Sequence, residues 1–210
     1  MNKCARYLAK SACITACLFI ANGCEDSGNS RDFGNNNPKV AVAMGDSITA
    51  LEGGNITTYP ELLAQSTGMT VINEGTGGAT SSDGADKIER ILSDYKPGYI
   101  LILYGANDVI RSESLDGTIA NLRYIITSAQ NNKTVPVIAT ITPMYYEHEV
   151  FLGGTRGVNA RIRQLAAETG CSLVDLESAF GGNTSYFNDD GLHPNDSGLR
   201  VIADSFAGAL

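Results

Sequence analysis

Short apolar runs alternate with amphipathic stretches along most of the chain. The runs are rich in Val and Ile, as expected for strands buried on both faces of a sheet, and they cover residues 39–44, 70–73, 99–104, 135–141 and 172–176. Helical patterns lie between these runs and after the last one, at residues 59–66, 83–95, 115–131, 156–169 and 198–210. In the second helical pattern, apolar residues recur in steps of three and four, and Pro97 ends it.

This alternation predicts an α/β fold with helices on both faces of a parallel sheet. The simplest arrangement is a three-layer α/β/α domain with a five-stranded, flavodoxin-like sheet. Residues 39–210 show no second break in composition and no internal repeat, so we expect one domain there. In such sheets ligands bind beyond the carboxyl ends of the strands. The loops that follow the strands are therefore the place to look for chemistry.

The first 23 residues have the layout of a bacterial export signal. Three basic residues and no acidic residue accompany an apolar stretch of about 11 residues, too short for a membrane-spanning helix of roughly 20. Gly23 and Cys24 resemble the lipobox of bacterial lipoproteins, in which the cysteine carries the lipid. Ala21 and Asn22 depart from that pattern, and Ala21-x-Gly23 also fits ordinary signal cleavage. We therefore expect an envelope lipoprotein anchored through Cys24, or a periplasmic or secreted protein.

Residues 24–38 are polar and rich in Asn, Gly and Ser, which is typical of a flexible tether. Removing the signal takes the basic residues from 15 to 12 against 23 acidic residues, so the net charge changes from −8 to about −11. Such a charge disfavours nucleic acid and anionic membrane surfaces as partners. Contact with a membrane is expected only through the N-terminal anchor, and the pattern predicts no oligomeric state.

One cysteine, Cys171, lies in the body of the chain, so that body offers no internal disulfide. Because Cys171 sits in an apolar, strand-like segment, we expect a buried and inert thiol.

Polar side chains stand in the loops after the first and third predicted strands. Residues 45–48 (GDSI) follow the first strand, where Ser47 can expose both its hydroxyl and its backbone N–H at the sheet edge. Residues 105–108 (GAND) follow the third strand, where Asn107 can aim its amide across the mouth of the sheet and Asp108 can brace the loop. Each motif alone also fits an ordinary turn or helix cap.

A glycine-rich loop, residues 73–80 (NEGTGGAT), follows the second predicted strand. Its backbone N–H groups suit either a phosphate or a developing oxyanion. The Gly75-x-Gly77 pair is a near-miss to the dinucleotide-binding fingerprint. Thr80 stands where a third glycine is expected, and the loop follows the second strand rather than the first, so the nucleotide interpretation is weak.

The last motif, residues 189–194 (DDGLHP), stands between the fifth predicted strand and the last helix. Asp190 and His193 are three residues apart, so one helical turn would bring the carboxylate against the imidazole, and Pro194 helps to fix the backbone. A carboxylate bonded to Nδ1 holds the tautomer whose Nε2 can accept a serine proton.

Taken together, these motifs resemble the four ordered blocks of the SGNH (GDSL-type) hydrolases. The matching residues are Ser47 in Gly-Asp-Ser, Gly78, Asn107 in Gly-x-Asn-Asp, and His193 in Asp190-x-x-His. They span the expected domain in the family's order, and each follows a predicted strand. Gly75 and Gly77 are further candidates for the glycine, and alignment of the blocks favours Gly78.

The resemblance implies a serine esterase without a metal or cofactor. Ser47 would attack an ester carbonyl, His193 would move the proton and Asp190 would stabilise the imidazolium. The backbone N–H groups of Ser47 and Gly78 and the amide of Asn107 would form the oxyanion hole. Esters of lysophospholipid, thioester or carbohydrate O-acetyl type all fit the family.

Two other functions remain open at this stage. The same residues could pass the acyl group to an acceptor alcohol, as an O-acyltransferase does, or the chain could be a non-catalytic envelope binding protein. Motifs of α/β-hydrolases, zinc proteases, P-loop proteins and thioredoxins are absent from the sequence. The second histidine, His148, follows the fourth predicted strand, where it could line a pocket or lie in a solvated loop; we favour the loop.

Overall fold

The computed structural model describes residues 31–50 and 52–210. The predicted export signal at residues 1–23, the candidate anchor Cys24 and the first part of the predicted tether lie outside these residues. Among the described helices, none combines the length and apolar character needed to cross a membrane.

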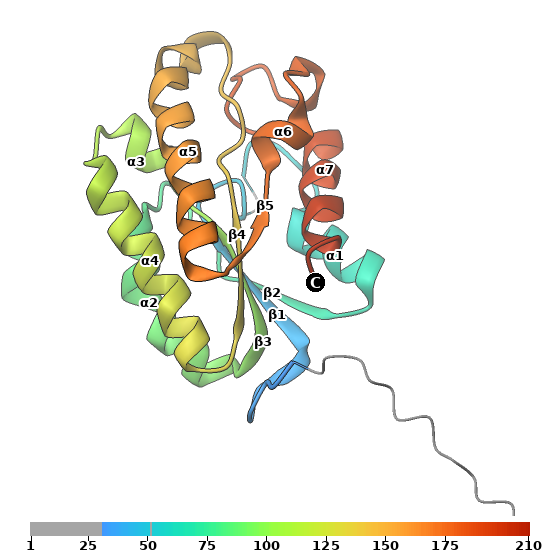
Figure 1. The fold of residues 1–210 in the computed structure, drawn as a ribbon. Coiled ribbons are helices and arrows are strands. Elements are labelled where there is room, and N and C mark those ends of the chain that lie inside the picture. Colours follow the sequence, from blue (N-terminus) through green and yellow to red (C-terminus); the bar gives the residue numbers. More distant parts are fainter. Residues whose placement is uncertain (1–30, 51) are drawn as a thin grey trace, which may run out of the picture. The chain divides into compact units, whose positions relative to one another are not determined.

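A five-stranded, all-parallel sheet forms the centre of the described residues (Figure 1). Its strands are β1 (Asn37–Gly45), β2 (Thr70–Asn73), β3 (Pro97–Leu103), β4 (Val135–Ala139) and β5 (Ser172–Val174). Their order across the sheet is β2-β1-β3-β4-β5. The predicted α/β fold and its flavodoxin-like sheet are confirmed.

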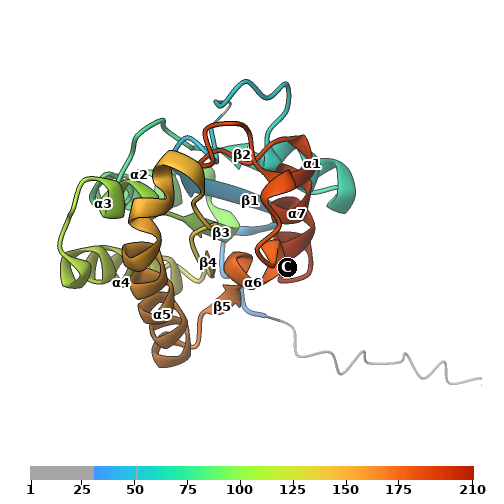
Figure 2. The same cartoon turned by 90° about the horizontal axis from the view of Figure 1, so that it is seen from above.

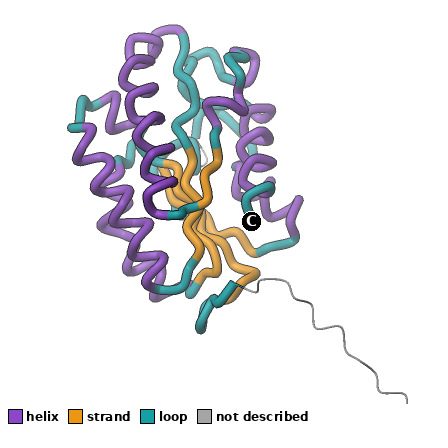
Figure 3. The backbone as a smooth tube through the Cα atoms, viewed as in Figure 1, coloured by secondary structure: helices purple, strands orange, loops and turns teal. Residues whose placement is uncertain are grey.

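Helices cover both faces of the sheet, as Figures 1 and 2 show. One face carries α1 (Tyr59–Thr67), the short α6 (Leu176–Phe180) and α7 (Asp196–Ala207), whereas the other carries α2 (Ser81–Tyr95), α4 (Leu115–Asn131) and α5 (Leu152–Thr169). The remaining short elements are the helix α3 (Ala106–Ile110) and two 3₁₀ turns, η1 (Tyr146–Phe151) and η2 (Thr184–Tyr186). Loops and short turns gather at the carboxyl ends of the strands (Figure 3).

The alternation of side chains along the central strands divides the apolar core in two. In β1, Val42 and Met44 face α2, α4 and α5, whereas Ala41 and Ala43 face α1, α6 and α7. All four side chains are fully buried. A strand covered by helices on both faces has to be apolar at successive positions, and this explains the continuous apolar runs of the sequence.

Two predicted strands end earlier than their apolar runs, because polar side chains form hydrogen bonds with backbone groups just beyond the strand ends. After β4, the N–H and C=O of Ile141 bond to the side chain of Asn159 in α5 instead of to a neighbouring strand. After β5, the Asp175 side chain accepts a hydrogen bond from Ser178 N and begins α6 at Leu176. Neither α3 nor α6 was predicted, since each is too short to show helical periodicity.

The predicted boundary between tether and domain at residue 39 was wrong. The compact unit begins at Asp32, and the Phe33 ring packs against the Tyr99 ring with 5.5 Å between centroids. Asn36 donates to Asn132 O at 2.6 Å, and β1 begins at Asn37. Residues 32–38 are polar in composition, but one aromatic ring and these hydrogen bonds tie them to the domain.

Candidate active site

Ser47 lies in the turn that follows β1. The turn is closed by the carbonyl of Asp46, which accepts hydrogen bonds from Thr49 N at 3.1 Å and Ala50 N at 2.9 Å. Gly45 begins it, and a Cβ there would stand 2.0 Å from Thr49 Oγ1 and 2.7 Å from Leu103 O. Only glycine fits so close an approach. The turn leaves the Ser47 side chain half-buried at the carboxyl edge of the sheet.

Ser47, His193 and Asp190 form one chain of hydrogen bonds. His193 Nε2 lies 2.9 Å from Ser47 Oγ, and His193 Nδ1 lies 2.6 Å from Asp190 Oδ2. Because a carboxylate only accepts, Nδ1 carries a proton and Nε2 of the neutral ring is left to accept from the serine hydroxyl. The structure thus brings together three side chains that lie up to 146 positions apart in sequence.

The connection between Asp190 and His193 differs from the one predicted. A turn joins them rather than a helical turn, and it is stabilised by Asp190 Oδ1, which accepts from Leu192 N and His193 N, both at 2.9 Å. Partial burial raises the pKa of the Asp190 carboxyl, but the hydrogen bonds from the His193 side chain and from these two amides outweigh burial and lower it overall. Asp190 is therefore held as a carboxylate beside the imidazole.

The glycine-rich loop after β2 folds back onto the turn that carries Ser47. Thr76 N donates to Gly45 O at 3.0 Å, and Asn73 Nδ2 donates to Thr49 O at 2.7 Å. Gly75 N is already bonded to Asn73 Oδ1 at 2.9 Å, which removes Gly75 from the candidate donors. Among the described residues, the N–H groups of Gly78 and Ser47 have no protein acceptor. Both amides are therefore free to bind an anion.

Asn107 stands in the first turn of α3, next to the glycine-rich loop. Its Nδ2 donates to Ala79 O at 3.0 Å and keeps a second hydrogen for a ligand. Four residues on, Arg111 donates from its guanidinium to Gly78 O at 2.6 Å. Asn107 and Arg111 thus bind two successive carbonyls, those of Ala79 and Gly78. The Asn107 side chain is therefore held next to the backbone segment that contains the Gly78 amide.

Asp108, predicted to brace its own loop, instead braces α2 and α4. Its buried carboxylate accepts from Ser81 N at 2.9 Å, from Ser81 Oγ at 2.5 Å and from Thr118 Oγ1 at 3.1 Å. Asp83 likewise takes the N–H of Thr80. Two carboxylates therefore occupy the start of α2, where a dinucleotide phosphate would need free amides. The nucleotide interpretation of this loop fails on that ground.

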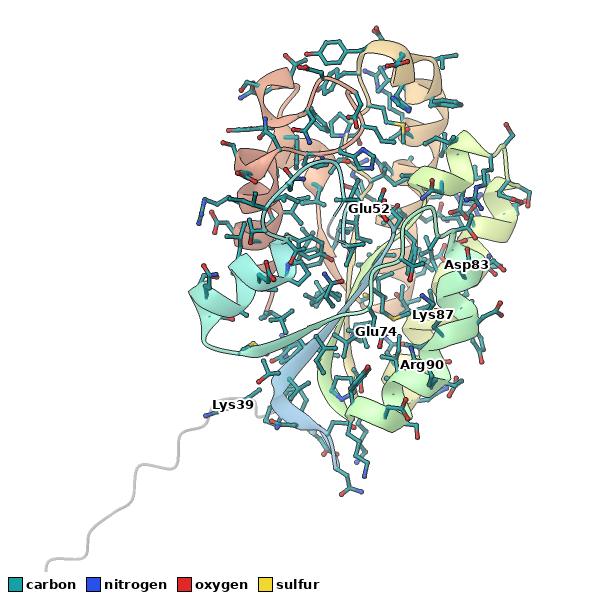
Figure 4. The ribbon with its side chains drawn as sticks, turned by 180° about the vertical axis from the view of Figure 1, so that it is seen from behind. Lys39, Glu52, Glu74, Asp83, Lys87 and Arg90 are labelled. Atoms are coloured by element: carbon teal, nitrogen blue, oxygen red, sulfur yellow. The ribbon has the colours of Figure 1, made fainter. Side chains whose placement is uncertain are left out.

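Charged side chains fix the outer side of the glycine-rich loop (Figure 4). Arg90 of α2 pairs with Glu74 at 2.7 Å, and Lys87 donates to Thr76 Oγ1 at 2.6 Å. Glu52 reaches Gly77 from the loop after β1, where its carboxylate occupies the space of a Cβ. These contacts join the loop to α2 and to the loop that follows β1.

Asp46 is buried directly behind Ser47, with 2% of its surface exposed. Burial raises the pKa of its carboxyl to about 6, even though a hydrogen bond from Ile48 N and the nearby His193 both act to lower it. The sequence had suggested no separate role for Asp46. Its position makes it part of the support beneath the nucleophile candidate.

Two further sequence predictions concern single side chains. Cys171 is a buried thiol whose Sγ lies 3.2 Å from Pro136 O, so the prediction of burial is confirmed. Burial raises its pKa to about 12, which favours the inert thiol expected from the sequence. His148 is half-buried in η1, and its Nδ1 lies 2.9 Å from Asp190 O. The sequence suggested neither this bond nor the bond from Arg111 to Gly78, because the partners lie 42 and 33 positions apart without a local pattern.

Among the described residues, no cluster of three or more His, Cys, Asp or Glu side chains could hold a metal ion.

A parallel α/β sheet that presents a hydrogen-bonded Ser–His–Asp chain at its carboxyl edge defines the class of this protein. The GDSL-like lipase/acylhydrolase family matches residues 43–201, and the chain belongs to that family. It is therefore an ester-hydrolysing enzyme of the GDSL type.

Several known proteins resemble this chain. It is 29% identical over 208 residues to an acetylxylan esterase of Geobacillus stearothermophilus, with 90% of each chain covered. It is 26% identical over 175 residues to the thioesterase 1/protease 1/lysophospholipase L1 of Escherichia coli, which covers 80% of this chain and 82% of that one. The crystal structure of a lipase/acylhydrolase from Enterococcus faecalis superposes with a TM-score of 0.72 at 21% identity, covering 80% of this chain and 93% of the other.

Proposed function

We propose that this chain hydrolyses carboxylic esters through an acyl-enzyme on Ser47, with His193 as the general base and Asp190 as its partner. The observation that carries the proposal is the unbroken path from Asp190 Oδ2 through the imidazole to Ser47 Oγ, with steps of 2.6 and 2.9 Å. Both distances lie within the range for proton transfer along hydrogen bonds. The lowered pKa of Asp190 keeps a negative charge beside the ring, where it stabilises the imidazolium that forms.

The reaction follows from this geometry. Ser47 Oγ attacks the ester carbonyl while its proton passes to His193 Nε2, and the same proton then leaves with the alcohol as the carbon–oxygen bond breaks. A water molecule then gives a proton to Nε2 and attacks the acyl-enzyme. Nε2 returns that proton to Ser47 Oγ as the acyl carbon–Oγ bond breaks, which releases the carboxylic acid and restores the free serine. In both halves the carbonyl oxygen gains negative charge, and the free amides of Ser47 and Gly78 with the Asn107 side chain supply donors for it.

The relatives support two substrate classes for this proposal. The similarity to an acetylxylan esterase supports a carbohydrate O-acetyl ester, and the similarity to a thioesterase/lysophospholipase supports a thioester or a lysophospholipid. A series of p-nitrophenyl esters from acetate to palmitate, measured beside acetylated xylo-oligosaccharides and a lysophospholipid, separates these classes. An O-acetyl esterase would lose kcat/KM steeply beyond the shortest acyl groups, whereas a lysophospholipase would retain it.

The proposal is tested first at Ser47. We expect Ser47→Ala to abolish ester turnover and labelling by a fluorophosphonate probe, because the variant lacks the nucleophile. Ser197→Ala, at a hydroxyl in the first turn of α7 outside the hydrogen-bonded chain, is the matched control and should keep both. An active or labelled Ser47→Ala variant would remove Ser47 from this role.

We infer from the N-terminal sequence that the enzyme works outside the cytoplasm. The basic start, the short apolar stretch and Cys24 support export with lipid attachment, and Ala21-x-Gly23 supports cleavage without it. In either case the domain from residue 32 onward would meet its substrate in the cell envelope or beyond it.

A further inference from the structure

The segment that follows β4 is hydrogen-bonded to the turn that carries Asp190. Tyr145 N donates to Gly191 O at 2.9 Å, and His148 Nδ1 lies 2.9 Å from Asp190 O. Because a carbonyl oxygen only accepts, Nδ1 of His148 carries a proton and donates. Two successive carbonyls of the Asp190 turn are thus held by one short segment, residues 145–148, which we call the β4 clamp.

The contact between the β4 clamp and the Asp190 turn is close and conformationally demanding. Gly191 has φ +68°, and a Cβ there would lie 2.4 Å from Tyr145 O and 2.7 Å from Tyr146 Cδ2. Tyr146 itself adopts φ +55°, a left-handed conformation that is unfavourable for a non-glycine residue. Conformations of this kind persist where the surrounding contacts hold them, and they concentrate at functional sites.

The β4 clamp is itself held in place by the domain. Tyr145 packs edge-on against Phe187 with ring centroids 5.1 Å apart, and His148 N donates to Tyr145 O at 3.0 Å. The His148 ring lies 6.3 Å from that of Phe151. The clamp therefore presents its two donors from a fixed frame rather than from a free loop.

The turn held in this way is the one that aims the Asp190 carboxylate. Packing alone does not fix that carboxylate, since 39% of its side chain is exposed. Its direction is set by the hydrogen bonds from Leu192 N and His193 N, and these amides belong to the same turn as the two gripped carbonyls. A shift of the Asp190–Gly191 backbone would carry the carboxylate away from Nδ1 of His193.

We propose that His148 is a positioning residue of the active site: its Nδ1–H, with the amide of Tyr145, fixes the Asp190–Gly191 backbone and so aims Asp190 at His193. This inference rests on the proposed function. His148 acts through Asp190 and does not handle the reacting atoms. It therefore neither lines an acyl pocket nor belongs to a solvated loop, the two roles considered from sequence.

Substitutions at His148 separate the hydrogen bond from the ring. In His148→Ala and His148→Phe the donor is lost, and the second variant keeps an aromatic ring beside Phe151. We expect both to lose kcat by roughly 10- to 100-fold, the scale of a small misplacement of a catalytic group, with little change in KM. His148→Asn carries an amide N–H near the place of Nδ1 and should recover most of the wild-type kcat. Glu149→Ala, at an exposed carboxylate on the same 3₁₀ turn, is the control and should behave as wild type.

A double-mutant cycle tests whether His148 works through Asp190. In an Asp190→Asn background the added His148→Ala change should lower kcat by less than about twofold, because the carboxylate that it positions is already gone. The inference is overturned by a full additive loss in that background. It is also overturned if His148→Asn is no better than His148→Phe, or if the substitutions change KM alone.

A readout without substrate distinguishes failure of this inference from failure of the proposed function. The proton between His193 Nδ1 and Asp190 should give a downfield ¹H resonance, since short hydrogen bonds to a carboxylate are strong, and the chain has only 2 histidines to assign. We expect His148→Phe to weaken or shift this resonance while thermal unfolding stays cooperative. An unchanged resonance overturns the positioning role even in an active enzyme. A resonance that responds in a chain without esterase activity supports the positioning role and refutes the proposed function.

Discussion

At the scale of single residues, the Asp190 carboxylate receives three hydrogen bonds, two from backbone amides and one from the His193 ring. The amide bonds would survive replacement by asparagine, because its Oδ1 still accepts. The hydrogen bond to His193 Nδ1 would lose its negatively charged acceptor, because asparagine is neutral. Asp190 thus combines a structural task, which asparagine can keep, with an electrostatic task, which it cannot.

We therefore expect Asp190→Asn to fold normally and to lose up to about 10⁴-fold in kcat, because the imidazolium loses its counter-charge and the favoured tautomer. The measurement is steady-state hydrolysis of a p-nitrophenyl ester. The neighbouring Asp189 provides the matched control, since it is an exposed carboxylate one position away. Asp189→Asn should retain wild-type kcat, and equal losses in both variants would deny Asp190 its particular role.

Asp46 should make the stability depend on pH. Burial raises its pKa from 3.8 to about 6, so the folded protein binds this proton more tightly than the unfolded chain does. The associated stability is fully present below about pH 4 and is lost as the pH rises through 6. A shift of roughly 2 units corresponds to about 3 kcal/mol.

Asp46→Asn tests this, since asparagine cannot ionise but can still accept from Ile48 N. Its free energy of unfolding in urea should exceed that of the wild type by about 2–3 kcal/mol more at pH 8 than at pH 4. If the difference between the two proteins were the same at both pH values, the carboxyl of Asp46 would titrate normally.

At the scale of elements, the strands and long helices lie close to the ranges predicted from apolar periodicity. The predicted helix at residues 115–131 and strand at residues 70–73 have the observed bounds of α4 and β2. Two strands end earlier than predicted where a polar side chain bonds to backbone groups, as Asn159 does after β4 and Asp175 does after β5. Asn159 lies in α5, 18 positions from Ile141, so local periodicity does not reveal its contact, whereas Asp175 caps the short helix that follows it.

Asn159 is the clearest case for a test at this scale. Its side chain is fully buried in α5, accepts from Ile141 N at 2.7 Å and donates to Ile141 O at 3.0 Å. Asn159→Ala would leave both backbone groups without partners and should lower the free energy of unfolding by roughly 2–5 kcal/mol.

Urea denaturation measures this loss. The control is Asn131→Ala, at an exposed position in the last turn of α4, which should change stability by less than about 0.5 kcal/mol. Similar losses at both positions would show that the buried pair of hydrogen bonds contributes nothing particular. The hydrogen bonds between Asn159 and Ile141 also matter for function, because Ile141 leads into the β4 clamp.

At the scale of the whole molecule, the domain begins at Asp32, and the sequence before it contains the predicted export signal and the candidate anchor Cys24. If Cys24 carries the lipid as proposed, Cys24→Ser should abolish palmitate labelling in a bacterial host and shift the protein out of the membrane fraction, because the variant lacks the thiol to be lipidated. Cys17→Ser, inside the apolar stretch, is the matched control and should leave labelling and fractionation unchanged. Equal distribution of wild type and Cys24→Ser would favour ordinary signal cleavage at Ala21-x-Gly23.

The sequence by itself determined the order of strands and helices, the parallel sheet and the loops that carry the four motifs. Periodicity and turn chemistry are local properties, and in a parallel sheet they place the loops after the strands at one edge. Tertiary structure alone decided how the loops meet. The contact of Ser47 with His193, the grip of His148 on Asp190 and that of Arg111 on Gly78 join residues 33 to 146 positions apart. Such contacts depend on how whole elements pack, and no short stretch of sequence contains that information.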